Sequence, residues 1–358
     1  MKAAALAEAA RISARFAEAG AEPFEADILQ PAATLLDLYG EDIRARAYVT
    51  TDPLRGELML RPDFTLPVVE MHMARGADPA RYRYQGEVFR RQETDDGRPS
   101  EYLQVGYEVF DRSDPAAADA EVFSLFSQVL DGVPATPVTG DIGILIAAVR
   151  GLSTSEARKA ALMRHIWRPA RFRALLDRYS GRTPVPPTRQ ALLQAEDPMQ
   201  GAGLLLGLRG ADEIAARIEA LRADAAEPPL GAGEVAVLGA ILTLKGSATG
   251  ALAALRDLIR EMPAIAAAIE GLDRRLDALG KRGVEVDSLA FEASHGRSAM
   301  EYYDGFVFSF QGPGDLPPLA TGGRYDALTR VLGRGRSIPA VGGVIRPDLV
   351  VQAREARG

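Results

Sequence analysis

The sequence of 358 residues predicts an α+β fold, in which an antiparallel sheet flanked by helices is built from both ends of the chain and interrupted by a helical insertion. Strand-like patterns gather near the two chain ends, whereas helical spacing dominates residues 150–280. The apolar fraction of 47% and the charged fraction of 25% are ordinary for a globular protein. We therefore assign residues 1–135 to the first part of the core, 136–284 to a mostly helical insertion and 285–358 to the second part of the core.

A helix is expected at the start of the chain. Apolar side chains at Ala5, Ala9, Ile12 and Phe16 form a helical stripe, and Gly20 suits the end of the helix. Charged residues interrupt this segment, so it lacks the continuous apolar stretch of a signal peptide. The chain also has no run of eighteen apolar residues that would span a membrane. We therefore expect a cytoplasmic protein without a membrane partner.

A long antiparallel hairpin follows in the first part of the core. Residues 82–89 and 102–110 are strand-like, and the polar residues 94–97 between them are typical of a turn. A helix is predicted over residues 114–131, because Asp114 and Pro115 form a typical helix start. In the second part of the core, strands are predicted over residues 286–293 and 302–310, the latter carrying a pair of tyrosines.

The helical insertion is basic at its start. Residues 150–190 hold ten cationic side chains, nine Arg and Lys159, against the acids Glu156 and Asp177, which is a local net charge of +8. Because the whole chain carries −7, the remainder carries −15. This asymmetry indicates either a docking surface for an acidic partner or polyanion, or a set of solvated helix faces in an Arg-rich protein.

Composition excludes several kinds of chemistry. The chain has no Cys, which excludes disulfides, cysteine-ligated metals and a thiol nucleophile. Its three His, at positions 72, 165 and 295, are too far apart in sequence to indicate a His-rich metal site. We expect neither a metal nor a cofactor.

Two arginines mark a candidate phosphate site. Arg90 and Arg98 lie at opposite ends of the polar loop of the hairpin, where guanidinium groups can bind a phosphate in bidentate fashion. Loop arginines are more often simply solvated, so these two positions alone do not establish a site.

A candidate amino-group site lies beside that loop. Gln104 and Glu108 are four residues apart on one strand and therefore point to the same face of the sheet. Asp63 and Thr65 are placed to complete the set, and Tyr303 is placed to line it. The alternative is that Glu108 pairs with a neighbouring Arg and that the tyrosine only packs.

In their order and spacing these stretches resemble the catalytic core of the histidyl-tRNA synthetases, a class II aminoacyl-tRNA synthetase family. FRRQ at 89–92 with the strand at 97–110 resembles motif 2 of that family, EYYDGFVF at 301–308 its histidine-specific segment, and GGRYD at 322–326 with PAVGG at 339–343 its approach to motif 3. The resemblance implies a histidine-binding set and a phosphate-binding remnant. The first comprises Asp63, Thr65, Gln104, Glu108, Tyr302, Tyr303 and Tyr325, and the second Arg90 and Arg98.

The chain departs from the synthetase pattern where ATP would bind. Gln92 and Ser100 replace charged residues of motif 2, and Ser298 stands where the family has the arginine that assists activation of the histidine carboxylate. Leu349 falls at the arginine of motif 3, and Arg346-Pro347 is expected to disrupt the helix start there. Adenylation requires positioned cations around the transferring phosphoryl group, so we expect no aminoacyl-adenylate synthesis. In the histidine pocket, Asp63 replaces a Glu and Phe64 a Gly.

We expect no anticodon-binding domain in this chain. A synthetase-like core that has an altered ATP site and lacks that domain resembles the regulatory subunits of short-form ATP phosphoribosyltransferase. Residues 140–149 and 162–181 are similar to the version found in some bacteria. The resemblance implies a non-catalytic homodimer inside a hetero-oligomer with the catalytic subunit, which condenses ATP with phosphoribosyl pyrophosphate in the first step of histidine biosynthesis. It also implies histidine as a feedback effector and no tRNA partner.

Two other functions stay open at this point. One is a free-standing class II-like ligase that activates an amino acid or other carboxylate with rearranged arginines such as Arg297, Arg324 or Arg346. The other is an RNA-binding remnant that uses the basic insertion. If the chain is a regulatory subunit, histidine binds either in the inherited amino-acid pocket or at the interface with the catalytic subunit.

Overall fold

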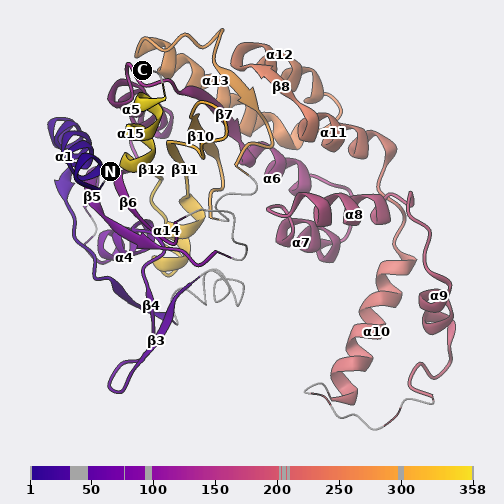
Figure 1. The fold of residues 1–358 in the computed structure, drawn as a ribbon. Helices are drawn as coiled ribbons and strands as arrows, with labels where there is room; N and C mark the ends of the chain where they lie inside the picture. The colour runs from indigo at the N-terminus through magenta and orange to yellow at the C-terminus, as the bar shows by residue number, and fades with distance from the viewer. Residues whose placement is uncertain are drawn as a thin grey trace.

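A computed structural model describes residues 2–32, 47–75, 77–92, 99–200, 203, 207, 210–296 and 302–356. These residues form a nine-stranded sheet of order β1-β5-β6-β12-β11-β10-β7-β9-β8 and a three-stranded sheet of order β2-β4-β3 (Figure 1). The strands of the large sheet are β1 (Glu22–Pro23), β5 (Ala80–Phe89), β6 (Glu101–Phe110), β12 (Ala340–Ile345), β11 (Ala320–Arg324), β10 (Phe306–Gln311), β7 (Thr136–Asp141), β9 (Ala290–Glu292) and β8 (Lys245–Ser247). Those of the small sheet are β2 (Leu29–Pro31), β4 (Gly56–Leu60) and β3 (Val49–Asp52).

Helices cover both faces of the large sheet and form the middle of the chain. The helices of the two core segments are α1 (Lys2–Glu18), α4 (Thr65–Arg75), α5 (Pro115–Val129), α14 (Asp326–Leu332) and α15 (Pro347–Glu355). Those of the middle are α6 (Ile142–Arg150), α7 (Glu156–Arg164), α8 (Pro169–Tyr179), α9 (Pro187–Gln194), α10 (Ala211–Ala226), α11 (Ala232–Thr243), α12 (Ala248–Leu258), the 3₁₀ turn η1 (Pro263–Ile265) and α13 (Ala266–Lys281). This arrangement confirms the predicted α+β class.

The centre of the large sheet is antiparallel, as predicted. The long hairpin is β5 and β6, paired antiparallel over their whole length. At the edges the sheet is mixed, because β1 pairs with β5 and β7 with β9 in parallel. Two predicted helices are also confirmed: α1 is followed by Gly20 at a φ of +85°, and α5 begins at Pro115, where the side chain of Asp114 accepts a hydrogen bond from the backbone N–H of Ala117.

Alternation along β6 separates two hydrophobic cores. Val105, Tyr107 and Val109 point to a core shared with α1 and α5, together with most of the middle helices. On the opposite face, Tyr82 and Tyr84 of β5 belong to a second core, shared with α4 and α14. Gln104 and Glu108 are even-numbered residues of β6 and lie on this second face.

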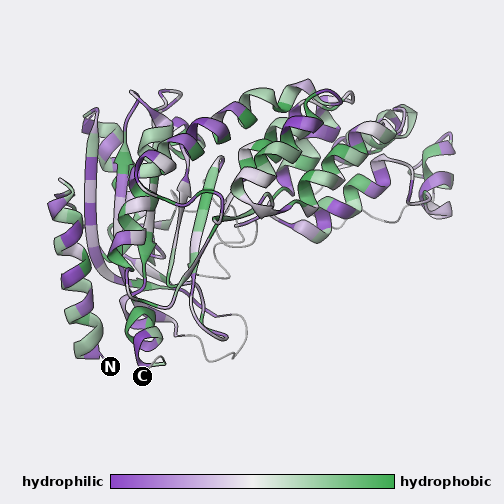
Figure 2. Ribbon diagram, turned by 90° about the horizontal axis from the view of Figure 1, so that it is seen from above, coloured by the Kyte–Doolittle hydropathy of each residue, from purple (hydrophilic) through white to green (hydrophobic). Residues whose placement is uncertain are grey.

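The middle of the chain divides into two structurally different parts (Figures 1 and 2). Helices α6, α11, α12 and α13 bury residues in the same core as the large sheet. Helices α9 and α10, which we call the arm, reach away from the sheet. Strand β7, which includes residue 136, pairs with β10 inside the large sheet. The predicted boundaries at residues 135 and 284 stay predictions, and the sheet itself extends past the first of them.

Three local predictions need correction. The strand predicted over 302–310 begins only at Phe306, because Asp304 instead accepts hydrogen bonds from the backbone at the start of α14. The strand predicted over 286–293 is limited to Ala290–Glu292. Pro347 does not disrupt a helix but starts one, since its missing N–H and restricted φ suit the first helical position of α15.

Within the described ranges, none of the helices is long and apolar enough to cross a membrane. In the same part of the chain, no group of three or more acidic or His side chains is placed to hold a metal ion.

Candidate functional site

A buried carboxylate, Glu108, lies at the centre of the candidate site. It is 1% exposed and sits on β6, opposite Tyr82 of β5 and Gly342 of β12 in the strand registers. A Cβ atom at position 342 would lie only 1.4 Å from Oε2 of Glu108. Glycine at position 342 therefore leaves the space that the carboxylate occupies.

Hydroxyl groups from three parts of the chain donate to this carboxylate. Oε2 of Glu108 accepts a hydrogen bond from Tyr325 at 2.6 Å, and Oε1 accepts one from Tyr84 at 2.9 Å and one from Thr65 at 3.1 Å. The hydroxyl of Tyr302 donates to that of Thr65 at 3.4 Å. We call these five residues the Glu108 cluster. It joins strands β5 and β6 with the starts of α4 and α14 and with the segment before β10.

The site has an excess of buried acceptors. Burial raises the pKa of Glu108 to about 7, although the three hydroxyl hydrogen bonds act in the opposite direction. Burial also raises the pKa of Asp63, against the attraction of Arg90. Oε1 of Gln104 is buried without a hydrogen-bond partner among the described residues. Two desolvated carboxyl groups and a free amide oxygen favour a ligand that brings positive charge and N–H donors.

Aromatic side chains enclose the Glu108 cluster. The ring of Phe64 stacks on that of Tyr84, with centroids 4.5 Å apart, and Tyr302 packs edge-on against Tyr303 and Tyr325 at 4.7 and 6.0 Å. Phe64, the residue that replaces a glycine of the synthetase pattern, therefore helps to form one wall of the site. All five rings belong to the second hydrophobic core.

Tyr84 is a site residue that the sequence analysis missed. Strand register places it opposite Gly106, and a Cβ atom there would lie 2.1 Å from Cζ of Tyr84. The signal was present in the sequence as a tyrosine on one strand of the hairpin and a glycine on the other. Recognising it requires the register of the two strands, which the length of the polar loop does not determine.

A cavity of about 330 Å³ adjoins the Glu108 cluster. Tyr302, Tyr303 and Asp304 line it from the core, and Trp167, the only tryptophan of the chain, lines it from the turn between α7 and α8. Burial raises the pKa of Asp304 to about 6, and the nearby charge of Asp326 adds to this shift. Asp304, which orients the start of α14 through two backbone hydrogen bonds, is not among the residues that the sequence motifs indicate.

The predicted phosphate side is only partly described. Arg90 donates from Nε to the carbonyl of Pro62, and its guanidinium lies 5.9 Å from the ring of Tyr102. Arg98, the other predicted phosphate ligand, and Arg297 lie outside the described residues.

The other two arginines considered for a ligase are held in ion pairs. Arg324 is buried and pairs with Asp119 at 2.6 Å and with Asp326 at 3.1 Å. Arg346 pairs with Asp348 at 3.0 Å, and its guanidinium lies 4.2 Å from the ring of Tyr102. Both side chains therefore have structural partners inside the chain.

Comparisons with known proteins show the family of this chain. The profile of the histidyl-tRNA synthetase family matches residues 2–227 and 214–350. A protein named ATP phosphoribosyltransferase regulatory subunit from Allorhizobium ampelinum is 32% identical over 95% of both chains, and one of the same name from Brucella anthropi is 32% identical over 90% of both.

Solved structures share the fold. An ATP phosphoribosyltransferase regulatory subunit/histidyl-tRNA synthetase from Bacillus halodurans superposes with a TM-score of 0.70 at 22% identity, over 98% of this chain and 79% of that one. A histidine–tRNA ligase subunit from Alicyclobacillus acidocaldarius gives 0.61 at 23% identity, over 99% and 94%. The predicted class II synthetase-like architecture is thereby confirmed.

Proposed function

The chain belongs to the ATP phosphoribosyltransferase regulatory subunits, and from this premise we propose that it binds the short catalytic subunit, supports its condensation of ATP with phosphoribosyl pyrophosphate, and makes the complex sensitive to histidine. The observation that carries the proposal is a contrast inside the site. The amino-acid side is a buried cluster of acidic and aromatic side chains, whereas Arg324 and Arg346 are held in internal ion pairs.

Loss of adenylation follows from that contrast. Transfer of an adenylyl group requires cations that are positioned around the phosphoryl group and free to stabilise its developing charge. Arg324 is held by Asp119 and Asp326, and Arg346 forms one hydrogen bond with Asp348, although its Nε has no hydrogen-bond partner among the described residues. We therefore propose that the protein has no catalytic activity of its own.

Histidine suits the Glu108 cluster chemically. Its ammonium and imidazole groups offer N–H donors and positive charge to Glu108, Asp63 and the free oxygen of Gln104. The predicted ligand residues Thr65, Tyr302 and Tyr325 belong to the same cluster. We propose the inherited pocket, rather than the subunit interface, as the site where histidine acts.

The proposed role is tested by reconstitution with the catalytic subunit. Addition of this chain is expected to raise the rate of ATP–phosphoribosyl pyrophosphate condensation, and histidine is expected to lower it again. Histidine-dependent ATP–pyrophosphate exchange by the chain alone is expected to be at background. Robust exchange would instead favour the free-standing ligase.

The proposed histidine site is tested by calorimetric titration of wild type, Glu108→Ala and Gln104→Ala, with Asp131→Ala as a matched control on the exposed surface. Affinity is expected to fall in the two site variants and to stay unchanged in the control. Trp167 fluorescence provides a second readout, because this residue lines the adjoining cavity. Unchanged affinity in both site variants would exclude the inherited amino-acid pocket as the histidine site and would favour the interface with the catalytic subunit.

Binding of histidine is also expected to release protons near pH 7. A bound cation lowers the pKa of Glu108 from about 7, so the protonated fraction of this carboxyl decreases. Titrations in two buffers of different ionisation enthalpy measure this release. We also propose that the chain forms a homodimer inside the hetero-oligomer, that it does not bind tRNA and that it is cytoplasmic.

A further inference from the structure

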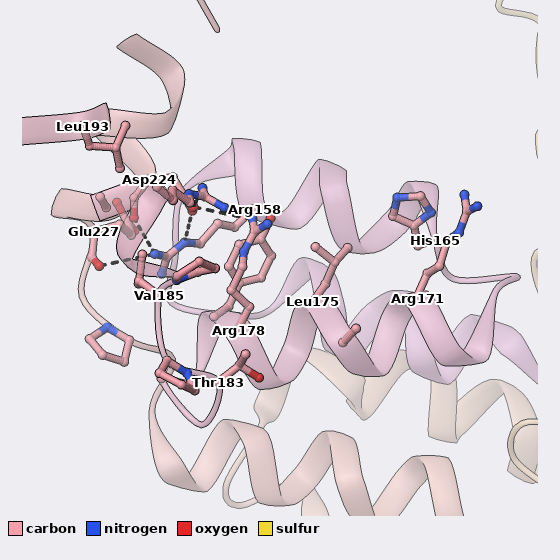
Figure 3. A pocket seen from close by; sticks show the side chains of 18 residues that line it. Arg158, His165, Arg171, Leu175, Arg178, Thr183, Val185, Leu193, Asp224 and Glu227 are labelled. Carbon is pink, nitrogen blue, oxygen red and sulfur yellow. Dashed lines mark hydrogen bonds and ion pairs between the residues drawn. The ribbon is translucent and has the colours of Figure 1, made fainter. Parts of the chain in front are cut away.

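A groove of about 670 Å³ runs along α8 and continues between residues 181–186, helix α9 and the end of α10 (Figure 3). Its α8 side is formed by Arg171, Ala174, Leu175 and Arg178, which share one helix face at a spacing of three and four residues. The neighbouring face of α8, with Phe172, Leu176 and Tyr179, is buried in the core of the protein, and Tyr179 also lines the groove. We call this feature the α8 groove. It is open to solvent and lies outside the Glu108 cluster.

The α8 groove gathers part of the basic charge that the sequence places between residues 150 and 190. Arg158, Arg171, Arg178 and Arg189 line it, against the described acids Asp224 and Glu227, so its lining carries a net charge of +2. The other six cations of that segment do not line the groove; of these, Lys159 pairs with Glu156, and Arg182 with Asp177.

The arginines of the α8 groove differ in how firmly they are held. Arg158 is buried and pairs with Asp224 at 2.7 Å, whereas Arg178 and Arg189 approach the same carboxylate only at 3.5 Å. Nε of Arg178 has no hydrogen-bond partner among the described residues. Arg171 is exposed and forms no ion pair with another described residue. Capacity to bind an anionic group therefore remains in this groove.

Apolar surface lies between these charges. Leu175, Val185 and Leu193 line the α8 groove, and Val185 is 50% exposed. In the described part of the arm, α9 buries no residue and α10 buries only Ile218. An apolar floor with arginines around it is the composition of a protein interface, in which aromatic residues and Arg are enriched. The arm gains little stability from its own packing, which suits a surface that a partner covers.

We propose that the α8 groove receives an acidic, amphipathic helical segment of the catalytic subunit. This inference rests on the proposed function and assigns a surface to it. Positive charge on the groove selects an acidic segment, and the apolar floor selects the amphipathic kind that packs helix-in-groove. A second copy of this chain is a poor occupant, because a two-fold contact through the groove would bring the same arginines together.

The test uses charge reversal with a matched control. The groove variant is Arg171→Glu with Arg178→Glu, and the control is Arg164→Glu with Arg173→Glu, exposed residues of α7 and α8 that do not line the groove. Both change the net charge equally. Calorimetry with the catalytic subunit is expected to show affinity lowered roughly 30-fold in the groove variant, the size of losing one interface hot spot, and little change in the control. Salt is expected to weaken wild-type binding more than that of the groove variant.

The outcomes separate the two proposals. If wild type fails to bind the catalytic subunit, both the proposed function and this surface are overturned. If wild type binds and the groove variant binds as the control does, only the surface is overturned. Val185→Glu serves as a second groove variant in case charge reversal on α8 prevents folding, because residue 185 lies in a loop. A change in self-association with unchanged binding of the catalytic subunit would identify a second copy as the occupant and overturn the proposal.

Discussion

The Glu108 cluster and the α8 groove use polar residues in opposite ways. In the cluster, a buried carboxylate is surrounded by hydroxyl donors within 3.1 Å, and the surplus charge is negative. In the α8 groove, arginines lie along an open apolar floor, and the surplus charge is positive. Burial makes each polar group in the cluster selective for a small complementary ligand, whereas exposure makes the groove suitable for a macromolecular surface. The sign and the burial of charge thus distinguish the two sites.

One short turn lies between these two regions. Residues of the turn between α7 and α8 face both ways: Ile166 and Trp167 line the cavity beside Tyr302 and Tyr303, and His165 lines the α8 groove. Trp167 packs against both hydrophobic cores.

The largest expected effect is on the ion pairs that join the insertion to the sheet. Asp119 accepts hydrogen bonds from Arg275 of α13 at 2.7 Å and from Arg324 of β11 at 2.6 Å. Asp119→Ala removes the carboxylate that both guanidinium groups share. Because these groups stay buried, we expect the free energy of unfolding to decrease by roughly 3–5 kcal/mol. Urea unfolding measures it. Asp131→Ala, an exposed acid after α5, is the control.

The same experiment tests whether the insertion and the sheet form one unit. A single transition at lower urea in Asp119→Ala is expected, because α13 and the sheet share a core. Two separate transitions, or a loss below about 1 kcal/mol, would contradict this interpretation of the ion pairs.

The second effect is the pH dependence of the Glu108 cluster. Burial raises the pKa of Glu108 from 4.5 to about 7, so the folded state binds a proton that the unfolded state has lost. Its contribution to stability is complete below pH 4.5 and decreases as the pH rises through 7. The side chain in Glu108→Gln stays neutral at every pH. As the pH rises from 4.5 to above 7, we therefore expect the free energy of unfolding of this variant to increase by about 3 kcal/mol relative to that of wild type. Unfolding measured at acidic and alkaline pH checks this, and parallel profiles of the two proteins would exclude it.

A third change should separate the two sites. Gly342→Ala inserts a Cβ atom against the carboxylate of Glu108, and such overpacking costs about 1–3 kcal/mol. We expect calorimetry to show loss of histidine binding with retained binding of the catalytic subunit. Gly233→Ala, on a helix where a Cβ meets nothing within 4 Å, is the control. If Gly342→Ala lost affinity for histidine and for the catalytic subunit to the same extent, the two sites would not be independent of each other.

The smallest effect is expected in the arm. Ile218 is the single buried residue of α10, and Ile218→Ala should lower global stability by about 1 kcal/mol or less, because the arm packs weakly. Leu272→Ala in α13, which fills the main core, should cost roughly 2–5 kcal/mol. Thermal unfolding compares the two variants. Equal losses would show that the arm is part of the cooperative core.

Part of the site was accessible to sequence reasoning and part was not. Alternation along one strand correctly placed Gln104 and Glu108 on one face, and motif order brought Thr65, Tyr302 and Tyr325 into the same set. That these residues bind histidine, and that Arg90 and Arg98 mark a phosphate site, stay predictions. The contact of Tyr84 with Glu108 could not be read in the same way, because it depends on how two strands are aligned.

The sequence by itself determined the fold class, the central hairpin, the helical middle and the family resemblance, because periodicity, turn residues and motif order are local properties of a chain. Only the tertiary structure decided which of ten clustered cations face one groove, and which pairs distant in sequence, such as Asp119 and Arg275, meet in the core. The physical reason is that these contacts depend on strand register and on packing between segments more than a hundred residues apart, where local pattern carries no information.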